Sequence, residues 1–301
     1  MRPRLSRRCA FVLLIAAIAA IVARVAVPAP ERDTRSPAGH IAFSAGAHPH
    51  EDIYVARADG SGLRRLTRHP GADFDPSWSP DGRRITYRHQ DGDDDASAEI
   101  YVMNADGSHK RDLTRRSGQD HAPAWSPDGR RIAFASAHGS PLPRIWVMNA
   151  DGSHQRRLSR LSGEYPSWSP DGEKIAFERN TFGRSGWDIW VTDADGSRAK
   201  PLLASQADEQ GAAWSPNGKR IAFQSDRGAA HGAHHIWTAY ANGSHARRLT
   251  RQFGERPVWS PSGAYILFTA GHLYIVRRDG SHTVAVAPRA PEELALADWA
   301  R

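Results

Sequence analysis

The sequence predicts an all-β protein, a six-bladed β-propeller closed by a strand from the C-terminal end of the chain. Three observations predict this fold. The motif Trp-Ser-Pro-Asp-Gly recurs, strand-like runs follow each copy in a constant order, and each end of the chain supplies part of a repeat. One small sheet cannot bury both of its faces, whereas a ring of such sheets buries each face against the next.

Five tryptophans mark the repeat. They are Trp78, Trp125, Trp168, Trp214 and Trp259, spaced 47, 43, 46 and 45 residues apart. Ser-Pro follows each of them, and the next two residues are Asp-Gly in three copies, Asn-Gly in one and Ser-Gly in one. Proline fixes its own φ and glycine accepts a positive φ, so each copy predicts a tight turn after a strand.

Two apolar, strand-like runs follow each tryptophan. The first runs are Ile85–Tyr87, Ile132–Phe134, Ile175–Phe177, Ile221–Phe223 and Ile266–Phe268. The second runs are Ile100–Val102, Ile145–Val147, Ile189–Val191, Ile236–Thr238 and Leu273–Ile275. An Asp-Gly or Asn-Gly pair comes after each second run, and β-branched and aromatic runs bounded by such pairs are typical of strands joined by turns. Each unit therefore predicts a sheet of four short strands.

The two ends of the chain together supply a sixth blade. Ile41–Phe43 and Ile53–Val55 repeat the two runs without a tryptophan before them, and Trp299 stands 40 residues after Trp259. A first blade without its opening strand and a spare strand at the C-terminal end combine into one sheet. We therefore expect the propeller to span residues 39–301.

The N-terminal segment, residues 1–27, predicts a secretory signal or an uncleaved membrane anchor. Five arginines and no acidic residue occur in residues 1–30, and an unbroken apolar run begins at Cys9, the only cysteine. We expect residues 9–27 to place the protein on the periplasmic or extracellular side of the membrane, secreted or anchored. Residues 28–38, rich in proline and charge, are expected to form a linker.

The net charge of +7 is concentrated in this N-terminal segment. Without its five arginines the chain carries 35 basic and 33 acidic side chains. The sequence has no recognised nucleic-acid-binding module, and its basic pairs are spread along the repeats. We therefore expect no nucleic-acid partner, and we expect a monomer.

The repeat unit closely resembles the propeller of the TolB family. It reads Trp-Ser-Pro-Asp-Gly, then Ile-Ala-Phe, then Ile-Tyr-Val, then Asp-Gly-Ser and Leu-Thr, across residues 39–301. Similar units occur in the non-catalytic propellers of dipeptidyl peptidase IV-like and tricorn proteases. The resemblance implies an exported propeller that binds other proteins or ligands at its channel mouth. TolB also carries an α/β domain before its propeller, and we expect none here, which leaves a link to the Tol system open.

Five carboxylates stand four or five residues before the tryptophans, at the start of the predicted inner strands. They are Asp73, Asp120, Glu164, Glu209 and Glu255, and Glu293 follows in poorer register. We expect them to form an acidic ring at one channel mouth, with His121 beside it. Such a ring suits a cation such as Ca²⁺ or a basic segment of a protein partner. Alternatively, the carboxylates accept backbone N–H groups at strand ends and only maintain the repeat.

Two loops hold further candidate ligands. Carboxylates alternate in residues 91–95, but Ala96 stands where an EF-hand loop requires glycine. Three histidines occur in residues 231–235, without a carboxylate or cysteine at ligand spacing. We interpret both segments as solvated loops.

The sequence favours a non-enzymatic scaffold that binds a protein partner in the cell envelope. The motifs of serine hydrolases, zinc proteases, P-loop proteins and dinucleotide-binding domains do not occur in it. Two alternatives stay open. One is a metal-dependent polysaccharide lyase, because TolB-like propellers include oligogalacturonate lyases, which hold their metal with channel histidines; here only His121 is suitably placed. The other is an extracytoplasmic ligand sensor that uses the central channel.

Overall fold

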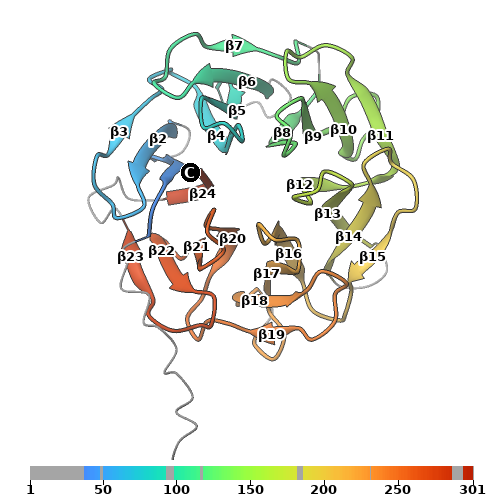
Figure 1. The fold of residues 1–301 in the computed structure, drawn as a ribbon. Helices are drawn as coiled ribbons and strands as arrows, with labels where there is room; N and C mark the ends of the chain where they lie inside the picture. Colours follow the sequence, from blue (N-terminus) through green and yellow to red (C-terminus); the bar gives the residue numbers. More distant parts are fainter. Residues whose placement is uncertain are drawn as a thin grey trace, which may run out of the picture. The chain divides into compact units, whose positions relative to one another are not determined.

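The computed structural model describes residues 37–47, 50–92, 98–115, 118–181, 186–230, 232–286 and 294–300. The chain from Pro37 onward forms a compact unit, in which the described residues build six four-stranded sheets around a ring (Figure 1). The prediction of an all-β, six-bladed propeller is confirmed. These described ranges contain no helix with the length and apolar character of a membrane span. The predicted signal or anchor, residues 1–27, lies outside them.

Each blade has four antiparallel strands that follow one another from the centre of the ring outward. The inner strands are β24 (Leu294–Ala300), β4 (Ala72–Trp78), β8 (Asp120–Trp125), β12 (Glu164–Trp168), β16 (Glu209–Trp214) and β20 (Glu255–Trp259). The second strands are β1 (His40–Ala45), β5 (Arg84–Gln90), β9 (Arg131–Ser136), β13 (Lys174–Asn180), β17 (Arg220–Ser225) and β21 (Tyr265–Thr269). The third strands are β2 (Asp52–Arg57), β6 (Glu99–Asn104), β10 (Arg144–Asn149), β14 (Trp187–Asp193), β18 (His235–Tyr240) and β22 (Leu273–Arg277). The outer strands are β3 (Arg64–Arg65), β7 (Arg111–Asp112), β11 (Arg156–Ser162), β15 (Lys200–Leu203), β19 (Arg247–Arg248) and β23 (Val284–Val286).

The Trp-Ser-Pro-Asp-Gly motif forms the turn between the inner and second strands. In the β4–β5 hairpin, the Ser79 N–H donates to the Arg84 carbonyl at 2.9 Å, and Ser79 Oγ accepts the Arg84 N–H at 2.9 Å. The same hydroxyl donates to Asp81 at 2.6 Å, and Gly82 takes a φ of 67°, which suits glycine. The serine contacts recur in the turns that begin at Ser126, Ser169 and Ser215.

The hydrophobic core lies between neighbouring blades. One aromatic side chain from each second strand is at most 2% exposed: Phe43, Tyr87, Phe134, Phe177, Phe223 and Phe268. The clusters join adjacent sheets, as where Ile100 of β6 packs with Trp125 of β8 and Phe134 of β9. Each sheet therefore buries its faces against the neighbouring sheets, as expected for a ring of stacked repeats.

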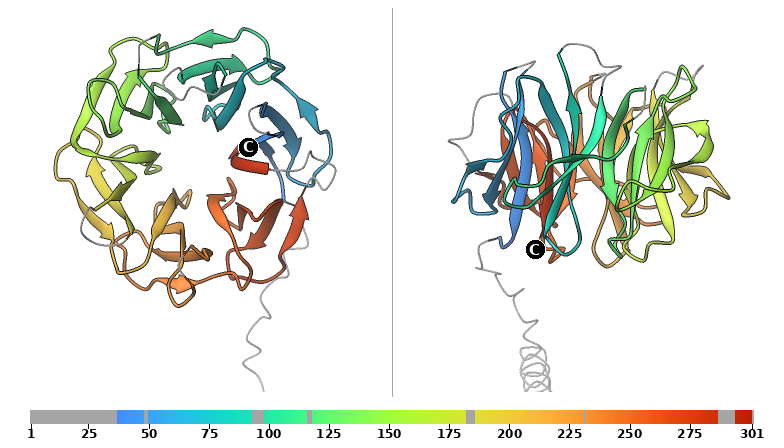
Figure 2. Two further views of the ribbon diagram at one scale, coloured as in Figure 1. Left: turned by 180° about the vertical axis from the view of Figure 1, so that it is seen from behind. Right: turned by 90° about the horizontal axis from the view of Figure 1, so that it is seen from above.

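Strand β24 closes the ring by pairing with β1. The two strands are antiparallel, with Trp299 opposite Ile41, and Figure 2 shows them side by side in one sheet. The Trp299 indole N–H donates to the Ala38 carbonyl at 3.0 Å, and Asp298 Oδ2 accepts the N–H of Trp78 from the next blade at 2.7 Å. The expected closure by a C-terminal strand is confirmed.

Candidate functional site

Five inner strands contain a β-bulge three residues before their tryptophan. The residues there have positive φ values between 49° and 64°: Asp75, Ala122, Tyr165, Gly211 and Arg256. The pairing of the inner with the second strand shifts register at the same place in each of these blades. A bulge re-aims a side chain relative to a regular strand. Here it places five chemically different residues in the lining of one central cavity.

The cavity has a volume of about 480 Å³ and lies at the end of the channel that carries the Trp-Ser-Pro-Asp-Gly turns. All six inner strands contribute to its wall, which is rich in proline, alanine and tryptophan. Besides three serines, the wall includes four larger polar side chains: Asp75, Tyr165, Arg256 and Asp298. A largely apolar wall with a few convergent polar groups, at a volume of about 300–1,000 Å³, is typical of ligand sites.

Arg256 is held in the cavity wall by contacts from two other blades. Its Nη1 donates to Glu178 Oε1 at 2.8 Å, and its guanidinium carbon lies 3.6 Å from the centre of the Tyr165 ring. The Gly211 N–H donates to the same Glu178 oxygen at 2.7 Å, and the Arg256 N–H donates to Gln224 at 2.8 Å. Burial raises the pKa of Glu178, while the charge of Arg256 opposes that rise. The arginine side chain is 21% exposed, so part of its charge still faces the cavity.

The two aspartates of the cavity connect neighbouring blades. Asp75 Oδ2 accepts the N–H of Ala122 from the next inner strand at 3.0 Å, as Asp298 accepts that of Trp78. Burial raises the pKa of Asp298. Burial and the charge of Asp75 also raise the pKa of Tyr165, so its phenol is neutral at physiological pH and is able to donate a hydrogen bond.

The predicted ring carboxylates lie at the opposite end of the inner strands and do not line this cavity. Asp73, Asp120 and Glu209 are at most 3% exposed. The side chains of Glu164 and Glu255 are 26% and 39% exposed. Glu293 lies outside the described residues. Three of the five carboxylates are therefore inside the blades, and the binding role of the set stays a prediction.

Four of these carboxylates pair with a basic side chain. The pairs are Asp73 with His89 (2.6 Å), Glu164 with His121 (3.5 Å), Glu209 with Arg227 (2.7 Å) and Glu255 with His234 (3.2 Å). The hydrogen bond that His234 donates to Glu255 raises the pKa of His234. Burial alone would lower the pKa of His89, but the hydrogen bond and charge of Asp73 outweigh it and raise that pKa.

Asp120 is buried, and its carboxylate interacts with the hydroxyls of Ser136 and Thr114. Its N–H donates to the Ala98 carbonyl at 2.9 Å. Burial raises the pKa of Asp120 to about 6, although the hydroxyls of Ser136 and Thr114 oppose the shift. The charged form of this carboxylate is therefore disfavoured by its surroundings.

The candidate loop residues are only partly within the described structure. Asp93, Asp95 and His231 lie outside the described residues. His234 contacts Glu255, as given above, and His235 Nδ1 lies 2.8 Å from the Gln252 carbonyl oxygen.

Sequence reasoning missed the group formed by Arg256, Tyr165 and Glu178. A signal was present, because the position three residues before the tryptophan holds a different residue type in each of the five complete repeats. Tryptophan, Ser-Pro and glycine recur because the fold needs them, so a varying position on an inner strand is a candidate for function. No feature of the repeat sequence predicted the bulge that points this side chain into the channel.

Fold and cavity together define a six-bladed propeller of the Trp-Ser-Pro-Asp-Gly repeat class with a ligand-sized central cavity. Comparison with known families gives two matches. Residues 35–187 match the tricorn protease N-terminal β-propeller domain, and residues 163–286 match the TolB β-propeller domain. The chain therefore belongs to the family of tricorn- and TolB-type β-propellers, which confirms the predicted TolB-like repeat.

Individual relatives agree with this assignment. The Tol-Pal system protein TolB of Nitratidesulfovibrio vulgaris is 42% identical over 40 residues, which cover 13% of this chain and only 9% of that protein. The crystal structure of TolB from Acinetobacter baumannii matches with a TM-score of 0.75 at 22% identity, over 88% of this chain and 67% of that one. A putative TolB structure from Agrobacterium tumefaciens matches with a TM-score of 0.66 at 19% identity, over 88% and 99%. At these identities the solved structures show a shared fold.

Proposed function

We propose that the protein is a non-enzymatic scaffold of the cell envelope that binds a segment of a protein partner through the mouth of its central channel. The observation that carries this proposal is the cavity of about 480 Å³ at the end of the ring with the Trp-Ser-Pro-Asp-Gly turns. The relative named Tol-Pal system protein TolB and the similar TolB structure support an envelope role. On this proposal, residues 9–27 export or anchor the chain, and the propeller acts as a monomer.

The chemistry of the cavity favours an extended peptide segment. Prolines from four inner strands, among them Pro76 and Pro257, give the wall an apolar surface that has no N–H donors at those positions. Arg256 and Tyr165 offer donors at fixed positions, since the contact with Glu178 and the ring stacking already hold them. A preorganised wall lowers the entropy that binding must overcome.

The acidic end of the channel has a more limited role in this proposal. Glu164 and Glu255 are the two predicted ring members with substantial exposure, and both are paired with a histidine of the preceding blade. We keep a basic partner segment or Ca²⁺ as the ligand predicted for this end. Replacing both glutamates with lysine should abolish either interaction, and thermal melting with and without millimolar Ca²⁺ distinguishes the two.

A ligand sensor is the second candidate function, because the cavity volume also lies in the range for a small molecule. The lyase alternative requires a group of channel histidines. His121 instead lies against Glu164 and Tyr165, with its ring centre 5.8 Å from that of the tyrosine. We therefore place the lyase behind the scaffold and the sensor.

Filling the cavity tests the proposal. Ser167 lines the cavity and its side chain is partly exposed, so Ser167→Trp should occupy the space that a partner segment needs. Lys200→Trp places the same side chain on the exposed outer strand β15 and serves as the matched control. The full chain and both variants are cross-linked to envelope proteins in cells, and the binding of the recovered partner is then measured with purified proteins.

The proposal predicts that Ser167→Trp weakens partner binding at least ~10-fold while Lys200→Trp leaves it unchanged. Equal binding by all three proteins would place the contact elsewhere on the surface. If no protein partner is recovered but a small molecule co-purifies with the wild type and not with Ser167→Trp, the sensor takes first place. Export is tested separately, with a reporter enzyme fused after residue 301 that is active only outside the cytoplasm; an inactive, soluble fusion would contradict it.

A further inference from the structure

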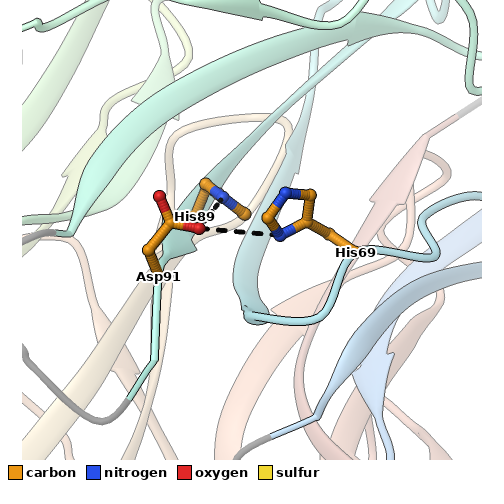
Figure 3. A group of neighbouring side chains, drawn as sticks. All are labelled: His69, His89 and Asp91. Carbon is orange, nitrogen blue, oxygen red and sulfur yellow. Dashed lines mark ion pairs between the residues drawn. The ribbon is translucent and has the colours of Figure 1, made fainter.

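A group of two histidines and one aspartate lies at the junction of the first two blades, away from the central cavity. His69 belongs to the connection between β3 and β4, His89 lies on β5, and Asp91 follows β5 directly. Figure 3 shows the three side chains pointing toward one another. One ligand atom from each lies within 4.8 Å of the other two.

The backbone of this region brings the two histidines together. A Cβ atom at Gly71 would lie 2.1 Å from the carbonyl oxygen of Gln90, so only glycine allows the β3–β4 connection to lie so close to the end of β5. The rings of His69 and His89 then meet edge to face, with centres 4.5 Å apart. The close backbone contact at Gly71 therefore places His69 beside His89.

Asp73 orients His89 for ligation. The buried Asp73 carboxylate lies 2.6 Å from Nδ1 of His89, so that nitrogen carries the proton and donates it to the carboxylate. The lone pair of Nε2 then points outward, where Nε2 lies 3.4 Å from Asp91 Oδ1. Histidines that bind metals commonly donate their second ring N–H to a carboxylate in this way.

We propose that His69, His89 and Asp91 form a binding site for a divalent transition-metal ion, Zn²⁺ in particular, with Asp73 as the positioning residue for His89. Nothing in the proposed scaffold function requires this site. Two imidazoles and one carboxylate are ligands that suit Zn²⁺, with water in the fourth position.

Two of the three spacings between ligand atoms are close to those around a tetrahedral ion, and all three are at most 4.8 Å. Asp91 Oδ1 lies 3.4 Å from His89 Nε2 and 3.7 Å from His69 Nδ1. Ligands about 2.0–2.1 Å from a tetrahedral Zn²⁺ lie roughly 3.3–3.4 Å from one another. Small side-chain adjustments therefore close the site around the ion. The Gly71 N–H also lies 3.2 Å from His69 Nδ1, and this long hydrogen bond would be given up when the metal binds.

The exposure of the group suits an accessible site. The side chains of His69 and Asp91 are 52% and 72% exposed, whereas that of His89 is 10% exposed. One rigid, buried ligand and two exposed ones let an ion enter from solvent and leave a coordination position open to water or to a side chain of a partner. Binding would also join the connection of the first blade to the second strand of the next, near the closure of the ring.

Zinc titration of the full chain, purified without a polyhistidine tag and freed of metal by chelation, tests this site. Isothermal titration with ZnCl₂ should show one saturable site of micromolar or tighter affinity. His69→Ala and Asp91→Asn change exposed ligands and should weaken that site at least ~10-fold. Asp73→Asn should weaken it roughly 10–100-fold, as loss of an orienting carboxylate does elsewhere. His272→Ala removes an exposed histidine of the sixth blade and should have no effect.

Co²⁺ gives a spectroscopic readout that a purely structural role would not change. The wild type should show the intense visible bands of four-coordinate Co²⁺, and Asp73→Asn should shift or weaken them while its melting temperature without metal shows that it is folded. No saturable zinc binding by the wild type would overturn the proposal. Zinc binding that His69→Ala and Asp91→Asn leave unchanged would overturn it equally, because the ion would then sit on other residues.

Discussion

Trp299→Ala should destabilise the propeller strongly, because it acts where the two ends of the chain join. The side chain is 6% exposed and belongs to a cluster with Ile41 and Phe43 of the first blade and Leu267 of the sixth. The substitution leaves a cavity between these blades and removes the hydrogen bond to the Ala38 carbonyl. Truncation of a buried tryptophan costs about 3–5 kcal/mol. For a domain of this size, that loss corresponds to a fall in melting temperature of roughly 6–20 °C.

Thermal melting monitored by circular dichroism gives the melting temperature, and urea unfolding at 25 °C gives the free energy of unfolding. Trp190→Ala is the control, because Trp190 is only partly buried and one face of its ring is covered by the Arg179 guanidinium at 4.5 Å. It should lose clearly less stability. Deleting residues 292–301 should be worse than either substitution, since it exposes the edge of β1 and leaves the ring open. A Trp299→Ala protein that melts within about 2 °C of the wild type would refute the closure argument.

Three further predictions concern charged side chains and their partners. Because burial raises the pKa of Asp120 to about 6, the folded protein retains a proton that the unfolded chain releases between about pH 4 and pH 6, so stability falls as pH rises through this window. In urea unfolding at both ends of this pH window, the free energy of unfolding of Asp120→Asn should not fall with pH. At the upper end it should exceed that of the wild type by on the order of 2–3 kcal/mol. Arg256→Met leaves Glu178 buried without its cation and should lose about 3–5 kcal/mol in the same assay, and adding Glu178→Gln should recover part of the loss; strictly additive losses would count against the pair. The hydrogen bond that His234 donates to Glu255 raises the pKa of His234. The stabilisation from this pair is therefore complete below about pH 6.5 and fades as pH rises through the raised value. Glu255→Gln should therefore lower the melting temperature more near about pH 5.5 than near about pH 8, and an equal effect at both values would contradict the pairing.

Most of the fold was predictable because each copy of the repeat needs the same residues to form its turns and strands. Ser79 and Gly82 make a turn whose hydrogen bonds recur in the following blades, so five copies carry the same local information. Trp299 was recognisable as the spare inner strand because it stands near the expected spacing after Trp259. These features are local along the chain or periodic, and both kinds of information are readable from one sequence.

The candidate site was less predictable, because it depends on a bulge and on contacts between blades. A regular inner strand with its start at the channel mouth would place Asp73 and Glu209 at that mouth, which was the expectation. The structure buries both instead, and the bulge brings Tyr165 and Arg256 into the cavity. The partner of Arg256 is Glu178, 78 residues away along the chain, and no spacing rule connects them.

The departures from repeat symmetry are where a single ligand would be recognised. A ring with the same residue at each of the five bulges would offer a ligand several equivalent orientations. Arg256 and Tyr165 stack against each other beside the small Gly211, whose strand lies between theirs, whereas Asp75 and Ala122 occupy the other two bulges. The wall therefore presents different chemistry at each of these positions. The same reasoning applies to the junction of the first two blades, where His69 and Gly71 belong to one connection only. Function in this propeller should therefore follow the residues that its repeats do not share, and substitutions at those positions should change binding before they change the fold.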